Sequence, residues 1–194
     1  MSNVAIVYHS GFGHTHALAE AVAKGAGSVA NTKVALIPVA EAEARQAELD
    51  AADAIIFGSP TYMGGVSADF AKFKDWTSKR WMEGTWRNKL AAGFTASASW
   101  NGDKHNTLYQ LLTLALQHGM IWVGLGLPPG FNHSKGSIED LNRLGASVGA
   151  MAQANADQGS DGIAASDFRT MESLGKRVAE AAHRWREEPL AVAA

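Results

Sequence analysis

Short apolar runs alternate with helical patterns along the chain, and this alternation limits the fold more than any other feature of the sequence. Five such runs occupy residues 4–8, 34–39, 54–58, 90–95 and 120–123. Each is nearly continuous in apolar residues, which is typical of strands that helices cover on both faces of a parallel sheet. We therefore predict an α/β fold of the smaller doubly wound type, with five parallel strands and helices on both faces.

The helical patterns lie between and after these runs. The clearest one places apolar residues at i, i+3, i+4, i+7 and i+8, which makes one stripe. It consists of Leu108, Leu111, Leu112, Ala115 and Leu116. The same spacing recurs near the C-terminal end and after the third run, and weakly near the start, at Met171, Leu174, Val178, Ala182 and Trp185, at Phe70, Phe73 and Trp76, and at Leu18 and Val22. The Ala/Glu-rich residues 40–50 cover the second crossover. A length of 194 residues fits one domain spanning residues 1–194.

Composition excludes several classes of protein. The chain has no cysteine, which excludes disulfide scaffolds, thiolate metal sites and cysteine nucleophiles and suits a reducing compartment. Its formal net charge of −2 gives no general attraction to nucleic acid. The apolar stretch at 120–127 is too short to span a membrane, and residues 4–8 have the pattern of a strand rather than of a signal peptide. We expect a cytoplasmic protein with no nucleic-acid partner and no membrane span.

The loop after the first run, residues 10–16 (SGFGHTH), has the composition of a phosphate cradle. Its glycines let backbone N–H groups turn towards a ligand, a helix opens at about Thr15, and Ser10 and Thr15 offer hydroxyl donors. The loop lacks the lysine of a Walker loop, and His16 stands where a dinucleotide fingerprint has its third glycine. A mononucleotide phosphate site and a plain strand-to-helix turn capped by Thr15 both remain open.

Two more loops follow expected strand ends, residues 59–66 (SPTYMGGV) and 96–102 (ASASWNG). In the first, proline and glycine shape a turn that carries Tyr62 and Met63 beyond the sheet, which gives a flat apolar wall for a planar heterocycle. Ligands of doubly wound sheets lie outside the carboxyl ends of the strands. The three loops together therefore predict one ligand site.

Four segments carry recognisable motifs: residues 7–14 (VYHSGFGH), 54–62 (AIIFGSPTY), 89–94 (KLAAGF) and 118–120 (HGM). They resemble the flavodoxin-like family, in particular the WrbA-type NAD(P)H:quinone oxidoreductases and the NADPH-dependent FMN reductases. The resemblance implies non-covalently bound FMN and an enzyme that passes two electrons from NAD(P)H to quinones by a ping-pong cycle. Three alternatives stay open: a flavin or ferric reductase that releases its flavin, a flavodoxin-type electron carrier, and a regulatory protein that binds FMN only to fold.

The resemblance also implies a set of site residues. It implies that the FMN phosphate is bound by Ser10, Gly11, Phe12, Gly13, His14 and Thr15, with Phe12 also facing the nicotinamide donor. It implies that the isoalloxazine lies along the turn formed by Pro60, Thr61, Tyr62, Met63 and Gly64. The pyrimidine side of the ring and the ribityl chain would contact Ala96, Ser97, Ala98, Ser99, Trp100 and Asn101. Gln117 and His118 are implied as further flavin contacts. Trp81 stands at the position where the family has an aromatic wall over the substrate pocket. Neither a catalytic acid–base group nor a metal is expected, because the flavin carries the reaction.

Residues 69–89 hold six basic and three acidic residues together with three tryptophans. We interpret the charges and Trp76 as a solvated helix face with an inward-packed ring, and leave a partner interface open for Trp81 and Trp86, which flank Gly84 in an expected loop. His118 is expected to end a helix, where a cationic ring interacts favourably with the helix dipole. Neighbouring subunits commonly complete the flavin site in this family, so we expect a homodimer or homotetramer.

Overall fold

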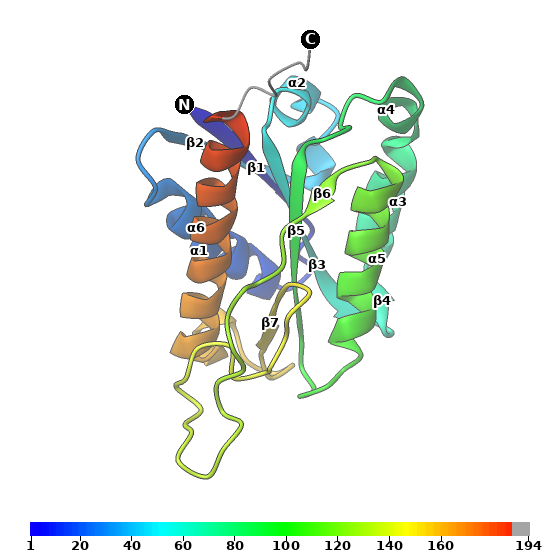
Figure 1. Cartoon of the computed structure of the whole chain (residues 1–194). Helices are drawn as coiled ribbons and strands as arrows, with labels where there is room; N and C mark the ends of the chain where they lie inside the picture. The colour runs from blue at the N-terminus through cyan, green and yellow to red at the C-terminus, as the bar shows by residue number, and fades with distance from the viewer. Residues whose placement is uncertain (188–194) are drawn as a thin grey trace.

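A central sheet lies between two layers of helices in the computed structural model, which describes residues 1–187 (Figure 1). The strands are β1 (Ser2–Tyr8), β2 (Thr32–Pro38), β3 (Ala54–Tyr62), β4 (Gly65–Val66), β5 (Leu90–Ser97), β6 (Ile121–Trp122) and β7 (Ala150–Gln153). The helices are α1 (His14–Gly27), η1 (Val39–Glu41), α2 (Gln46–Asp50), α3 (Ala68–Trp76), α4 (Ser78–Glu83), α5 (Lys104–Gln117), η2 (Ser160–Gly162) and α6 (Ala165–Glu187). The end of the expected domain, residues 188–194, lies outside the described residues.

The strand order confirms the predicted doubly wound α/β class. The path is β2-β1-β3-β5-β6, with every pair along it parallel, and only the short β4 runs antiparallel, against β3. Tyr8 pairs with Pro38 and Gly58, and Pro60 pairs with Ala96. The carboxyl ends of β1, β3 and β5 therefore lie at one edge of the sheet, where ligands of this architecture bind.

Both faces of the sheet are covered, which explains why its strands are continuous in apolar residues. Val4 and Ile6 of β1 pack in one core with α1 and α6, whereas Ala5 and Val7 pack in the other core with α3 and α5. Because successive side chains of a strand point to opposite faces, the middle of a strand between two cores is apolar at every position. Figure 1 shows α1 and α6 on one side of the sheet and α3 and α5 on the other.

The fifth strand position differs from the prediction of one strand at 120–123. β6 pairs with the start of β5 at Leu90 and Ala91, and β7 pairs with its end, from Phe94 to Ser97. The chain leaves the sheet between them, and the described residues 124–149 contain neither helix nor strand. The excursion closes on itself where the Leu125 N–H donates to the Ser147 oxygen at 3.0 Å. β7 was missed because only four residues pair there.

The second crossover is also less regular than the predicted helix over residues 40–50. It forms the 3₁₀ turn η1 and the five-residue α2 instead. In its interior only Ala42 and Leu49 are buried, so the segment offers a helix one core contact per two turns. Arg45 also ties its middle to β2, because the guanidinium donates to the Leu36 oxygen at 2.7 Å.

The predicted helices at α1, α3, α5 and α6 are confirmed. Their apolar stripes are buried, as with Leu108 and Leu111 of α5 and Met171 and Leu174 of α6. Within residues 1–187 no helix combines the length and apolarity that a membrane crossing requires.

Candidate functional site

Three strand-end loops and the segment after β7 surround one pocket at the carboxyl edge of the sheet, which we call the edge pocket. Its volume is about 300 Å³, within the range of small-molecule sites. Its lining residues are Ser10, Gly11, Phe12, His14, Thr15, Pro60, Thr61, Tyr62, Ala96, Ser97, Ala98, Ala154 and Ala156. The structure thus brings together most of the residues implied for the cofactor, from loops far apart in the sequence.

The first loop presents an uncapped helix end to this pocket. Gly13 is the N-cap of α1 with φ 92°, a left-handed conformation that glycine adopts without strain, and no side chain caps the helix. The Gly13 N–H binds the Ser10 hydroxyl oxygen at 3.1 Å, whereas within residues 1–187 no acceptor pairs with the N–H groups of Phe12, His14 and Thr15. Free amides and the positive end of the helix dipole form a site for an anion. The alternative in which Thr15 caps the helix is wrong.

Tyr62 forms a second wall, because β3 runs four residues beyond the predicted strand. Its ring meets Phe12 edge-on, with the ring centroids 6.3 Å apart. Gly11 lies so close to the Tyr62 hydroxyl that a side chain there would collide with it. Burial raises the pKa of Tyr62, although the Gly11 backbone N–H opposes the shift, so the phenol is neutral at pH 7. Phe12 is 81% exposed, which leaves this side open to a second molecule.

Hydroxyl groups behind the pocket fix the end of β3. Thr61 bonds Thr95 and Thr107 through their hydroxyls, at 2.8 Å each, and all three are buried. This cluster satisfies three polar groups in the interior. Thr61 therefore lines the pocket, but its hydroxyl group stabilises the strand ends; Thr95 and Thr107 gave no signal in the sequence.

Small side chains form the remaining wall. Ala96 and Ala98 come from β5 and its loop, and the sequence analysis missed Ala154 and Ala156, which follow β7. The Ala154 N–H donates to the Ser97 oxygen at 3.2 Å, which holds the two segments together. A smooth wall without side-chain bulk suits a planar ring or an extended chain.

Some implied cofactor residues lie beside the edge pocket rather than in it. Met63 and Gly64 form a turn with positive φ in which Met63 is fully exposed. Ser99 is exposed in the loop after β5, whereas Trp100 and Asn101 line a separate hollow of about 600 Å³ with Phe131 and Arg143. Gly13 does not line the pocket, although it caps the helix that faces it.

Gln117 and His118, which the resemblance implies as flavin contacts, do not line the edge pocket of their own chain. α5 starts beside the pocket and its 14 residues, at about 1.5 Å each, carry the chain to the other edge of the sheet. There the Asn88 N–H binds the Gly119 oxygen at 3.0 Å, just before β5 begins. The resemblance placed these residues by motif, and a motif does not state which end of a helix it occupies.

Trp81, implied as part of an aromatic wall over the substrate pocket, is likewise at the far edge and does not line the edge pocket of its own chain. It belongs to α4, which Figure 1 shows at the end of the sheet opposite β7. The preceding Arg80 binds Asp50 at 2.9 Å, next to the start of β3. Trp81 remains 52% exposed at that edge.

The interpretation of segment 69–89 as a solvated helix face holds for Lys72, Lys79 and Arg87, which are exposed, but is wrong for the buried Arg80 and the half-buried Lys89. Trp76 packs inward on the core, as expected. The Arg80 guanidinium stacks 4.0 Å from the Trp76 ring centroid, and Lys89 donates to the Asp50 and Ala52 oxygens at 2.8 and 2.6 Å. Trp86 is fully buried with its indole N–H on Asp50, so a partner interface is wrong for it.

His118 is buried and neutral, not a cation at a helix end. Its Nε2 lies 2.9 Å from the Thr77 hydroxyl, whose own proton goes to the Lys74 oxygen, so the ring donates this bond. Burial, and then the charge of Arg80, lower the pKa of His118 to about 4. The ring therefore gains its proton more readily in the unfolded chain.

This difference predicts acid sensitivity. Between the unfolded value of about 6.5 and the folded value of about 4, the unfolded chain binds more protons, so stability falls as the pH falls. We expect about 2 kcal/mol of the free energy of unfolding to be lost between pH 7 and pH 4.5 through this residue. Urea denaturation of the wild type and of His118→Gln at both pH values measures it. An equal loss in both proteins would contradict the assignment.

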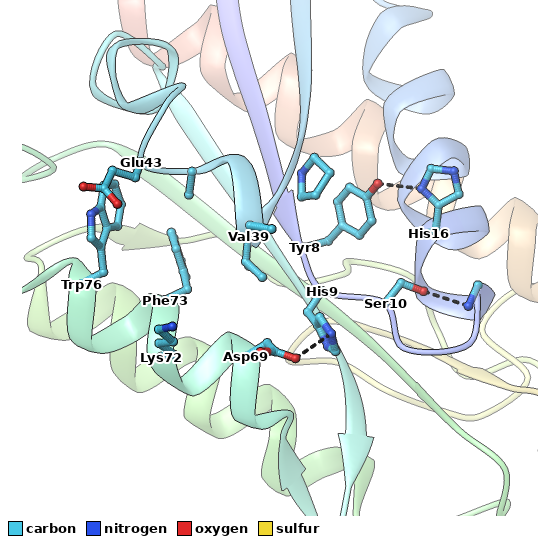
Figure 2. A pocket seen from close by; sticks show the side chains of 14 residues that line it. Tyr8, His9, Ser10, His16, Val39, Glu43, Asp69, Lys72, Phe73 and Trp76 are labelled. Atoms are coloured by element: carbon cyan, nitrogen blue, oxygen red, sulfur yellow. Dashed lines mark hydrogen bonds and ion pairs between the residues drawn. The ribbon is translucent and has the colours of Figure 1, made fainter.

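A second hollow, of about 810 Å³, lies on the other side of the first loop (Figure 2). Tyr8 and His16 meet there at 2.6 Å, and His9 lies 3.1 Å from Asp69. Trp76 and Glu43 lie at its far end in Figure 2. This hollow borders only one of the three strand-end loops, so it lacks the convergence that distinguishes the edge pocket.

The fold and the edge pocket define a flavodoxin-like protein, and the comparisons agree. The family model described as NADPH-dependent FMN reductase matches residues 30–127, and this family implies FMN as the cofactor. The chain belongs to the WrbA-type branch of the flavodoxin-like family. It is similar to a WrbA-like flavodoxin structure from Agrobacterium tumefaciens, with a TM-score of 0.76, 43% identity, and coverage of 96% of this chain and 100% of that one.

Two curated relatives have different names. Flavodoxin FldP of Pseudomonas aeruginosa is 46% identical over 92% of this chain and 96% of its own length. An NAD(P)H dehydrogenase (quinone) of Gluconacetobacter diazotrophicus is 34% identical over 94% of this chain and 98% of its own. The chain thus belongs to an oxidoreductase family whose members include both a protein named as a flavodoxin and proteins named as NAD(P)H dehydrogenases (quinone).

Proposed function

We propose that this protein binds FMN in the edge pocket and transfers two electrons from NAD(P)H to a quinone or similar small acceptor. The observation that carries the proposal is the convergence of an uncapped helix end, the Tyr62 wall and a smooth alanine wall on one pocket. Together they offer donors for a phosphate at one end and a flat apolar surface at the other.

The residues of the pocket divide the work of holding the cofactor. The N–H groups of Phe12, His14 and Thr15, with the Thr15 hydroxyl, bind the phosphate. Tyr62 and the alanines of β5 and β7 orient the ring and exclude water from its inner face. When bound, FMN supplies the redox chemistry, because it accepts a hydride from the nicotinamide and passes two electrons on.

The exposed ring of Phe12 supports a ping-pong cycle. It borders the open side of the pocket, where the donor and then the acceptor stack in turn. Anaerobic stopped-flow mixing with NADPH or NADH, followed by benzoquinone, tests the proposal. We expect bleaching of the flavin absorbance by the nicotinamide and its return with the quinone. Steady-state lines that intersect, rather than run parallel, would contradict the ping-pong order.

An electron carrier is the second candidate, favoured by the 46% identity to flavodoxin FldP. A carrier keeps its flavin oxidised when NAD(P)H is added without a reductase, so the same first mixing step decides between the two. An electron carrier commonly docks basic partners through an acidic surface, whereas the formal net charge here is only −2. Light scattering tests the expected homodimer or homotetramer.

The phosphate site makes its own prediction. Thr15→Val removes one hydroxyl donor to a charged group, so we expect about tenfold weaker FMN binding. Riboflavin, which lacks the phosphate, should bind equally well to both proteins. Fluorescence quenching of each flavin measures the dissociation constants, with Thr113→Val on the exposed face of α5 as the control. An equal loss of riboflavin affinity would place Thr15 at the ring.

A further inference from the structure

A buried lysine lies directly behind the pocket wall. Lys104 is the first residue of α5 and is only 1% exposed. Its ammonium donates to the Ser97 hydroxyl at 2.9 Å and to the Ser99 and Trp100 oxygens at 2.7 and 2.8 Å. All three donors of the ammonium are therefore used on loop 97–103, whose first residue lines the edge pocket. This lysine sets the course of the loop.

Lys104 belongs to a buried cluster with two further charges. Arg143 binds Asp167 through two parallel bonds of 2.7 Å, and the side chains of this pair are 1% exposed. Burial lowers the pKa of Lys104 to about 8. The charges of both residues also act on this pKa, because Asp167 raises it and Arg143 lowers it further. We call these three residues the basic cluster. Its net charge is one positive charge, because Asp167 neutralises only one of the two cations.

The cluster is tied to both sides of the wall. Asp167 accepts the Gln153 N–H at 2.9 Å, and the Gln153 amide donates to the Ala98 oxygen at 2.8 Å. Ala98 lines the pocket, and Gln153 precedes Ala154, which also lines it. A positive charge in an environment of low dielectric constant acts strongly on a charge across such a wall.

We infer that Lys104 positions loop 97–103 against the cofactor and that the basic cluster makes bound FMN easier to reduce. This inference rests on the proposed binding of FMN in the edge pocket. A hydride adds two electrons and one proton, so the reduced ring carries one negative charge until a second proton arrives. A net positive charge behind the wall stabilises that form over the neutral oxidised ring, which raises the reduction potential.

The test is a redox titration of the FMN-loaded protein. Xanthine and xanthine oxidase reduce it anaerobically beside a reference dye, and spectra give the two-electron potential. We expect Lys104→Gln to weaken the preference for reduced over oxidised FMN about tenfold, which lowers the potential by about 30 mV. Lys104→Arg, which keeps the charge, should stay within about threefold of the wild type. Lys135→Gln, in the exposed part of the excursion, is the control.

Gln153→Glu tests the same charge without removing the lysine. It adds a negative charge next to the cluster at a half-buried position, so the potential should fall in the same direction even if Lys104→Gln does not fold. A wild-type potential in both Lys104→Gln and Gln153→Glu would overturn the inference, as would an equal fall in Lys104→Arg. Because no nicotinamide is used, a protein that keeps FMN but ignores NADPH refutes the proposed reaction and leaves this comparison intact.

Discussion

Replacing Asp167 by asparagine is expected to lower the free energy of unfolding by about 3–5 kcal/mol, since it leaves buried cations without their counter-charge. Asp167 binds Arg143 through two bonds and also accepts the Gln153 N–H of β7. In the asparagine variant, Arg143 and Lys104 repel one another in an interior that water does not reach. Within residues 1–187, Nη1 of Arg143 already has no partner.

Urea denaturation at pH 7 measures this loss, and Asp157→Asn is the matched control. Asp157 is exposed beyond β7, so its replacement should change stability by no more than about 0.5 kcal/mol. Because Asp167 holds β7, the variant should also bind FMN more weakly than the control. A loss below about 1 kcal/mol would mean that the interior adjusts to the unpaired charges.

The sheet could be predicted from the sequence because burial on both faces makes a strand continuously apolar. This pattern is visible without knowing which strands pair with one another. The strands β1, β3 and β5 show it as runs of Val, Ile, Ala and Phe. β7 reads Ala-Met-Ala-Gln, and its place beside β5 depends on a chain that returns after a long excursion. Local composition does not encode that return, so the positions of Ala154 and Ala156 in the pocket wall could not be predicted from the sequence.

The position of Gln117 and His118 at the far edge of their own chain could, in contrast, be predicted from the sequence. The apolar stripe from Leu108 to Leu116 already implied a helix of about three turns after the fourth strand. Such a helix ends at the edge opposite to the one at which it starts, so Gln117 and His118 had to lie away from the strand-end loops. The periodicity was a better guide than the motif.

Lys104 gave a weak signal that only the structure made interpretable. A lysine at the first position of a helix opposes the helix dipole, which makes it an unfavourable choice without a compensating contact. The structure supplies that contact in the carbonyl oxygens of Ser99 and Trp100. A residue that violates a local rule marks a place where tertiary structure, or function, has overridden it.

Close backbone packing between α1 and α6 leads to the last prediction. A Cβ atom on Gly175 would overlap the Val22 carbonyl oxygen and lie 2.9 Å from the Ala26 nitrogen, and one on Gly25 would lie 2.6 Å from the Glu172 carbonyl carbon. Because the overlapping atoms belong to the backbone, no change of side-chain rotamer can relieve the overlap. Helix propensity alone predicts that Gly175→Ala stabilises the protein by about 1 kcal/mol. Overlap predicts the opposite sign.

We expect the overlap to dominate, with a loss of about 2–4 kcal/mol in the free energy of unfolding, because the two helices must separate and open voids along the core they share with β1. Gly27→Ala is the control, since a Cβ there meets only Val34 at 3.9 Å and should leave stability unchanged or slightly raised. Thermal and urea denaturation of both variants supply the comparison. If Gly175→Ala were as stable as Gly27→Ala, the contact between the two backbones would be looser than the structure has it, and propensity would govern this helix.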